Sequence, residues 1–269
     1  MSFESQVKSN ELVIGDDNYR SHIWINSPNR GTGLLPREIP YGELGFAARF
    51  EDSEIPLIPE DEWKERIEDK ERNKTRLSDM IERNEIPFKD QGSLPYCWIY
   101  APVHAVEVLR MIQNEPYVAL SATACGAKIK DFEKVGGWGS DGLKFLAEHG
   151  CPSELLWPNL DMSRTLDNQQ TWEEAKRHKV VEAWFDMPAK SVPHLISCLL
   201  ANIPVPVGYN WWRHEVLATD AVWHRGGPAI RIRNQWADWG SNGFGILHGR
   251  KMEPDDQVAP RAATPGGAL

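Results

Sequence analysis

The chain has 269 residues and a formal net charge of -9, from 30 Lys and Arg against 39 Asp and Glu. No segment gathers Lys and Arg without interleaved acids, which argues against nucleic-acid and membrane-surface partners. The four scattered cysteines form neither a CxxC pair nor a disulfide framework, so a zinc site is not expected and a reducing compartment such as the cytoplasm is favoured. The first residues lack a signal-peptide pattern, and no apolar run has the length of a membrane helix.

The first third of the chain predicts an arm followed by a charged helix. Residues 1–58 are rich in Gly, Pro, Asn and Ser and hold only short apolar stretches, at 12–14 and 22–25, so we expect an extended N-terminal arm with one or two short strands. Residues 59–88 are dominated by strong helix formers, which predict a helix over 60–83 and then a linker. This helix should dock by its apolar ends and stay solvated in between.

The rest of the chain predicts helices first and strands afterwards. A largely buried helix is expected to begin at residue 97. Further helices are expected at 121–130, 141–149, 171–178 and 193–202. In the helix at 171–178, Thr171 is expected to be the cap. From residue 203 onward, β-rich runs alternate with Gly, Pro and Asn clusters. This order predicts an α+β fold in which residues 89–250 form one domain with an antiparallel sheet and residues 251–269 form a flexible tail.

Cys97 is the first candidate for chemistry, because it stands where the buried helix is expected to begin. Backbone N–H groups at a helix start favour an anion and lower the pKa of a thiol. A lone cysteine in this place is more often an inert buried thiol. The surrounding run DQGSLPYCWIYA adds Gln91, six residues before the cysteine, and Trp98, directly after it.

A second group of candidate residues lies far downstream. His214 precedes a predicted strand, and Asn234 and Trp236 follow within NQWADWGSNGFG. Two other histidines compete: His104 on the Cys97 helix is interpreted as a packed residue, and His224 is expected in a loop. The order Gln-Gly-Ser-x-x-x-Cys-Trp, then His, then Asn-x-Trp and Trp-Gly-x-Asn-Gly-aromatic-Gly resembles the papain-like cysteine peptidases.

The resemblance implies a helical half carrying the Cys, an antiparallel sheet half carrying the His and Asn, and a cleft between them. It implies that Cys97 is a thiolate nucleophile, that His214 is its ion-pair partner and proton donor, and that Asn234 orients the imidazole. Gln91 and the Cys97 N–H would hold the oxyanion, and Trp236 and Trp98 would shield the site. No metal and no organic cofactor is implied.

The resemblance also implies a substrate-binding stretch at VGGWG. Gly136 and Gly137 would pair with the substrate main chain and Trp138 would border the pocket, although a Gly pair equally suits a plain turn. Glu215, directly after His214, would face the specificity pocket and favour basic side chains there.

The sequence leaves several alternatives open. Positions 94 and 134 hold Leu and Lys where secreted members of the family carry a disulfide, which fits a reducing compartment. Residues 1–88 are either an inhibitory propeptide or a permanently docked segment. The first functional hypothesis is a peptidase acting on a peptide or protein substrate, and a related amide or isopeptide reaction would use the same residues. The other is an adaptor in a larger assembly, such as a virus-like particle, that binds protein neighbours through its arm and tail.

Overall fold

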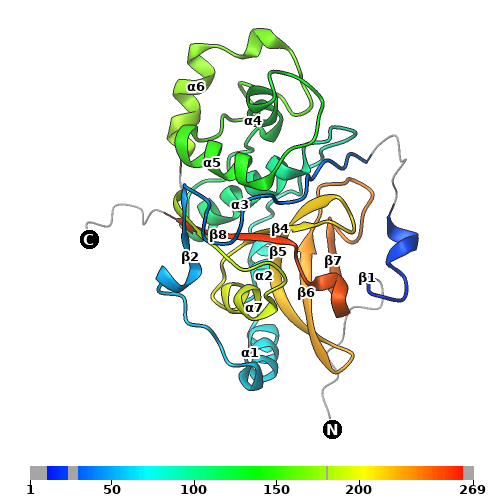
Figure 1. Ribbon diagram of the computed structural model, residues 1–269. Helices are drawn as coiled ribbons and strands as arrows, with labels where there is room; N and C mark the ends of the chain where they lie inside the picture. The colour runs from blue at the N-terminus through cyan, green and yellow to red at the C-terminus, as the bar shows by residue number, and fades with distance from the viewer. Residues whose placement is uncertain (1–10, 24–29, 180, 263–269) are drawn as a thin grey trace.

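The computed structural model describes residues 11–23, 30–179 and 181–262, and it places a group of helices beside a large sheet (Figure 1). The α-helices in these residues are α1 (Glu60–Asn73), α2 (Leu77–Arg83), α3 (Cys97–Ile112), α4 (Ala122–Ile129), α5 (Gly139–His149), α6 (Gln169–Ala175) and α7 (Val192–Leu200). Helices α3 to α6 form the helical half, as the order of elements predicts. The other half is built on the sheet, and α1 and α7 pack against its strand β5.

Eight strands of the described residues form one sheet, in the order β1-β7-β6-β5-β4-β8-β3-β2. The strands are β1 (Leu12–Ile14), β2 (Ala47–Arg49), β3 (Val181–Asp186), β4 (Val205–Tyr209), β5 (His214–His224), β6 (Gly227–Arg233), β7 (Phe244–His248) and β8 (Asp256–Ala262). The central pairs are antiparallel, as expected. The two edge strands, β1 and β2, come from the N-terminal arm and pair in parallel with β7 and β3. Of the two strands considered for the arm, 12–14 is present as β1, whereas residues 24 and 25 of the second lie outside the described residues.

The prediction of a flexible tail from residue 251 is wrong for the residues up to 262. Strand β8 lies between β4 and β3 and pairs with both. Its Val258 and Ala259 are buried, and their burial holds the strand in place. Local composition hid this strand, because Pro and Asp residues precede it and only its pairing with distant strands stabilises it. Residues 263–269 lie outside the described residues.

The single helix predicted over 60–83 is two helices. Lys74 adopts a left-handed conformation, with φ 55°, and ends α1, and α2 begins at Leu77. Arg76 stabilises the junction, because its side chain pairs with Glu71 at 3.3 Å and with Asp79 at 2.9 Å. The change of direction allows Leu77 to enter the core, which a continuous solvated helix would not permit.

One helix start also differs from the prediction. Helix α6 begins at Gln169, and its cap is Asn168, whose Oδ1 accepts a hydrogen bond of 3.1 Å from the Thr171 N–H. Thr171 is therefore the third residue of the helix and not its cap. An Asn side chain serves the same purpose as Thr, so the sequence offered two caps three residues apart.

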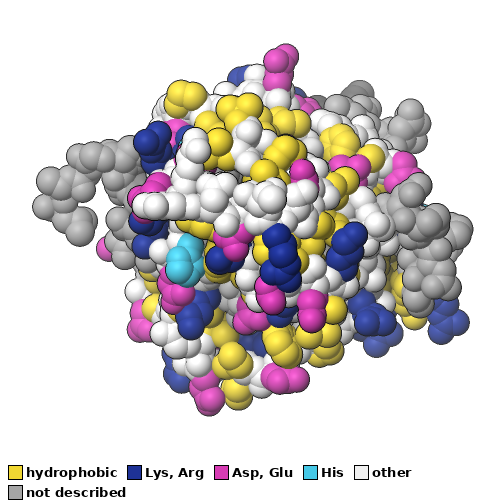
Figure 2. Space-filling model, turned by 90° about the horizontal axis from the view of Figure 1, so that it is seen from above, with side chains coloured by type: hydrophobic (Ala, Val, Ile, Leu, Met, Phe, Trp, Pro, Cys, Tyr) yellow, Lys and Arg dark blue, Asp and Glu magenta, His cyan; other side chains and the backbone are white. Residues whose placement is uncertain are grey.

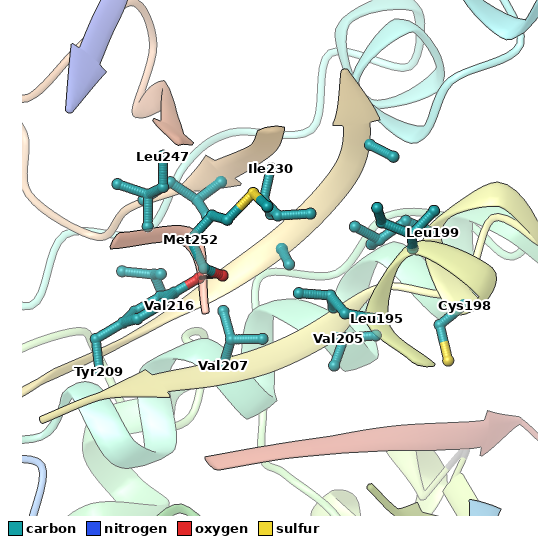
Figure 3. Close-up of a cluster of buried hydrophobic side chains, with 14 of the residues drawn as sticks. Leu195, Cys198, Leu199, Val205, Val207, Tyr209, Val216, Ile230, Leu247 and Met252 are labelled. Atoms are coloured by element: carbon teal, nitrogen blue, oxygen red, sulfur yellow. Dashed lines mark hydrogen bonds between the residues drawn. The ribbon is translucent and has the colours of Figure 1, made fainter. Parts of the chain in front are cut away.

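The core of the sheet half draws apolar side chains from helix and strands alike (Figure 3). In Figure 3, side chains of α7 lie beside those of β4, and Val216 of β5, Ile230 of β6 and Leu247 of β7 continue the cluster. Trp63 and Ile67 of α1 belong to the same core, and Leu77 and Ile81 of α2 pack in a second cluster with α3 and β5. Residues 60–83 therefore contribute to the interior of the fold.

The surface agrees with the mixed charge pattern of the sequence. Figure 2 shows one face, on which Lys and Arg side chains are interspersed with Asp and Glu, beside a group of hydrophobic side chains. No helix within the described ranges has both the length and the apolar character needed to cross a bilayer.

Candidate active site

Cys97 is the first residue of α3 and is fully buried. The helix start favours the thiolate, but burial acts in the opposite direction and raises the pKa of Cys97 to about 12. The backbone N–H groups of Glu215, Gly33 and Leu34 partly oppose this rise. In this structure the sulfur is therefore a neutral thiol at neutral pH.

His214, the first residue of β5, contacts the two residues expected beside it. Its Nε2 lies 2.8 Å from Asn234 Oδ1, and its ring stacks on Trp236 with centroids 4.3 Å apart and an interplanar angle of 22°. The Gln235 N–H also donates to Asn234 Oδ1, so this oxygen is an acceptor and His214 Nε2 carries the proton. The other nitrogen, Nδ1, is then the basic one, and it makes no hydrogen bond within the described residues. Burial lowers the pKa of His214 to about 3, so the imidazole is neutral.

The two competing histidines have other surroundings. His104 is buried in α3, with Nε2 3.3 Å from a nitrogen of Arg233, as expected of a packed residue. His224 is the last residue of β5 and lies against the His248 ring. The prediction that it lies in a loop is therefore wrong, because the strand ends at this residue.

Gln91 is fully buried, and its side-chain amide is already hydrogen bonded. Nε2 donates to the Leu94 carbonyl at 2.6 Å and to the Gly31 carbonyl at 3.0 Å. Trp236 Nε1 donates to the same Gly31 oxygen at 3.1 Å. The Leu94 carbonyl and a carbonyl of the N-terminal arm thus accept from the amide that the sequence assigned to an oxyanion.

Residues 30–36, the arm segment, lie between the helical half and the sheet half (Figure 1). The N–H groups of Gly33 and Leu34 donate to the Arg213 carbonyl at 3.2 Å, next to His214. On the other side, Gly137 donates to Gly33 at 2.9 Å and accepts from Leu35 at 2.9 Å. The main chain expected to bind substrate therefore binds the arm segment.

The other residues predicted around the substrate also contact the arm segment or support it. Trp138 Nε1 donates to the Pro36 carbonyl at 3.0 Å. Trp98 is buried beneath Gly137, and its Nε1 donates to the Pro95 carbonyl at 3.0 Å. Gly136 lies so close to Gly33 that an added Cβ would collide with the Gly33 carbonyl oxygen. The Gly pair thus serves close main-chain pairing and not a plain turn.

Two glycines of the arm segment allow it to lie between the helical half and the sheet half. A Cβ on Gly31 would collide with the Leu94 carbonyl oxygen, and a Cβ on Gly33 would collide with the Pro95 carbonyl oxygen. Both obstacles are backbone atoms just before Cys97 and cannot turn aside as a flexible side chain would. The alternation of glycines in RGTGLL was the available signal for this close approach, and the sequence reasoning did not use it.

Trp212 is a further residue that the sequence reasoning missed. Its ring lies 5.0 Å from that of His214, 5.5 Å from that of Trp236 and 5.8 Å from that of Trp239. These aromatic rings exclude water from the His214–Asn234 hydrogen bond. Trp212 lies in the turn just before β5, and the available signal was the aromatic pair two residues before His214 in the pattern NWWRH.

Glu215 carries a buried carboxyl group, of which Oε2 has no hydrogen-bond partner in the described part of the chain. Burial, with a smaller contribution from the carboxyl of Asp256, raises the pKa of Glu215 well above its ordinary value of 4.5. The folded chain thus holds a proton that the unfolded chain releases as the pH rises through about 4.5. This group's contribution to stability is complete at lower pH and is lost as the pH rises.

Glu215→Gln is therefore expected to increase the free energy of unfolding at pH 7 by about 1 kcal/mol or more, because it removes the cost of proton uptake. The gain should shrink steadily as the pH falls toward 4.5. Urea unfolding at a series of pH values measures the difference, with the exposed Glu82→Gln as control. A difference that does not change with pH would show that Glu215 is ionised in the folded chain.

Comparison with known proteins finds similarity in structure but none in sequence. No protein-family model matches the chain, and no curated protein matches it in sequence. Among solved structures, xylellain, a cysteine protease from Xylella fastidiosa, matches with a TM-score of 0.60 and 17% identity over 89% of this chain and 99% of that chain. Digestive procathepsin L 3 from the larval midgut of Tenebrio molitor matches with a TM-score of 0.57 and 16% identity, over 91% of this chain and 78% of that chain.

These likenesses define the class of fold. The chain has the fold of the papain-like cysteine proteases, which confirms the predicted resemblance at the level of the fold. The roles of Cys97, His214, Asn234 and Gln91 stay predictions at this identity.

Proposed function

We propose that the chain is a thiol hydrolase, a cysteine peptidase that cleaves peptide bonds, and that the arm segment keeps it latent. The observation that carries the proposal is the pairing of His214 with Asn234 under Trp236, in a fold where Cys97 begins α3 and this helix packs against β5. A buried histidine with one nitrogen fixed by an amide oxygen and the other left as a base is suited to proton transfer.

The reaction requires the arm segment to leave first. Solvent then reaches Cys97 and His214, and the burial that keeps both neutral is relieved. A proton passes from the thiol to His214 Nδ1, and the thiolate attacks the substrate carbonyl. The amide of Gln91, freed from the Gly31 carbonyl, donates to the oxyanion together with the Cys97 N–H. The imidazolium protonates the leaving amine, and water then hydrolyses the thioester and restores the thiol.

The arm segment resembles a bound peptide in each of these contacts. Its Gly31 carbonyl accepts from Gln91, and its main chain pairs with Gly137. It pairs with Gly137 in parallel, through Leu34. The N–H groups of Gly33 and Leu34 lie near the Cys97 sulfur, where the carbonyl of a scissile bond would have to lie. Such an occupant blocks the site without being a substrate.

The test uses a variant in which the arm segment cannot enter, Gly31→Ala/Gly33→Ala, called the arm-open variant. We expect it to hydrolyse a fluorescently labelled unfolded protein, and we expect Cys97→Ala or His214→Ala in the same background to lower the rate at least about 1,000-fold. Cys198→Ala, which removes a buried thiol of the sheet core, is the matched control and should retain activity.

The competing function, an adaptor that uses this fold as a binding module, makes the opposite prediction. In that case the arm-open variant stays folded, Cys97 accepts a thiol-directed epoxide no faster than a free thiol, and no substrate is cut. An acyl-transfer enzyme would consume the peptide only when an amine acceptor is supplied, which mass spectrometry of the products detects.

A further inference from the structure

Two of the four free cysteines, Cys125 and Cys151, lie in contact inside the helical half. Cys125 is in the middle of α4, and Cys151 follows α5 and its cap residue Gly150, where α4 packs against α5 (Figure 1). The two sulfur atoms are 3.5 Å apart, and both residues are 0% exposed. The other two cysteines belong to other helices, Cys97 to α3 and Cys198 to α7. The wide spacing of the cysteines in the sequence concealed this contact.

Main-chain pairing holds the two cysteine positions beside each other. The Ser121 N–H, at the start of α4, donates to the Pro152 carbonyl at 2.7 Å. Just outside this bond, the Glu154 N–H donates to the Ala119 carbonyl at 2.7 Å. The chain just before α4 and the chain just after α5 are thus fixed to one another. Two thiols that face each other across such a junction satisfy the main geometric requirement for a disulfide.

In the reduced chain the two thiols form weak hydrogen bonds. The Cys125 thiol donates to Cys151 Sγ, and the Cys151 thiol lies 3.5 Å from the Ser121 carbonyl oxygen. Burial, together with the neighbouring Cys125, raises the pKa of Cys151 well above its ordinary value of 9.0. Because the thiolate is the form that attacks a disulfide, the folded and reduced chain is slow to oxidise. The reaction is faster during folding or a local opening, when solvent reaches the sulfur atoms.

A bond between these cysteines would enclose a segment that the site depends on. Residues 125–151 contain the whole of α5 and the stretch 136–138, which binds the arm segment. A disulfide would close these residues into a covalent loop, which restricts the unfolded chain and so favours the folded one. Positions 94 and 134, where secreted members of the family carry a disulfide, are not part of this pair.

We propose that Cys125 and Cys151 are a disulfide-forming site that fits the folded helical half and is oxidised by a low-molecular-weight disulfide such as glutathione disulfide. The thiolate of one cysteine attacks a sulfur of the reagent, and one glutathione thiolate leaves. The thiolate of the second cysteine attacks the protein sulfur of this mixed disulfide, and the second glutathione thiolate leaves. The two protons of the protein thiols pass to the two glutathione thiolates. Two protein thiols are thus oxidised, and one reagent disulfide is reduced.

The compartment decides which form is present. In a reducing compartment the pair stays as two thiols, whereas in an oxidising compartment the bond closes. The inference does not rest on the proposed function, because neither cysteine takes part in that chemistry.

The test refolds the full chain from urea with excess glutathione disulfide, beside a sample with reduced glutathione alone. Remaining thiols are blocked with iodoacetamide, and peptide mapping by mass spectrometry identifies linked and unlinked cysteines. We expect one cross-link, between Cys125 and Cys151, with none at Cys97 or Cys198. The oxidised chain should unfold at a urea concentration about 1 M or more above that of the same chain after reduction.

Three variants assign the effect to the pair. Cys125→Ala and Cys151→Ala should each abolish the cross-link and the difference in urea midpoint, and Cys198→Ala should retain both. If either of the first two variants fails to fold, the peptide map of the unchanged chain still decides. A map without the Cys125–Cys151 cross-link, or with a cross-link to Cys97 or Cys198, overturns the inference. A cross-linked chain that is no more stable than the reduced chain also overturns it, because the bond would then not fit the fold.

Discussion

The arm-open variant, Gly31→Ala/Gly33→Ala, is expected to react with a thiol-directed epoxide at Cys97 at least about 100-fold faster than the unchanged chain. Each added Cβ meets a backbone carbonyl just before Cys97, and overpacking of this kind costs about 1 to 3 kcal/mol per site. Two sites together amount to about 3 kcal/mol or more, and each 1.4 kcal/mol changes an equilibrium constant about tenfold. The arm segment is therefore displaced for a much larger share of the time.

The matched control lies in the same arm. Gly45→Ala adds the same methyl group where nothing lies within 4 Å, so it should leave the labelling rate unchanged. Mass spectrometry of the labelled chain identifies the modified cysteine and gives the rate. If the arm-open variant is folded and its Cys97 still reacts at the rate of the unchanged chain, the arm segment does not control access to the thiol.

Truncation of the apolar side chains of α1 and α2 is expected to have the largest effect on stability. Ile67 and Leu77 are buried, at 1% and 0% exposure, and belong to two different core clusters. Ile67→Ala and Leu77→Ala should each lower the free energy of unfolding by about 3 kcal/mol, because the core loses contacts and keeps a cavity. Glu65→Ala on the exposed face of α1 should change it by less than about 0.5 kcal/mol.

This prediction separates the two interpretations of residues 1–88. A propeptide is removable, and its loss near residue 85 would leave a stable and active domain. A helix pair that completes the core is not removable, and a chain lacking residues 1–83 should unfold at low urea. Urea unfolding of the variants decides between them: small losses for both Ile67→Ala and Leu77→Ala would favour the propeptide. Because α1 and α2 belong to the core, the proposed function assigns inhibition to the arm segment and not to this helix pair.

The contacts of His214 with Asn234 and Trp236 could be predicted from the sequence, whereas the course of the arm could not. The types and spacing of these residues indicated that they would meet, and their roles in chemistry, with that of Cys97, stay predictions. The position of β8 was missed because its pairing with β3 and β4 depends on residues far away in the sequence. The junction at Lys74 was missed because helix propensity favours continuity, whereas buried contacts decided the break.

The arm segment could not be placed from the sequence for a similar reason. Gly31 and Gly33 indicate close backbone contact but do not name the partner. Arg37 was not singled out, because its two carboxylate partners lie about 150 and 220 residues downstream and none of the three is in a motif. Glu215 was found only because it follows His214. Its surroundings, with Gly208 leaving an open place in the neighbouring strand, became visible only in the folded sheet.

The arm is fastened to the sheet on both sides of the arm segment. β1 lies at one edge of the sheet and β2 at the other, so the chain between them crosses the whole molecule. A tether held at two ends returns to its site by a unimolecular step, at an effective concentration that dilution does not change. One cut on either side would leave the segment still attached at the other end. Under the proposed function, latency is a reversible equilibrium within one molecule, which a tightly binding substrate shifts by competing for the place of the arm segment.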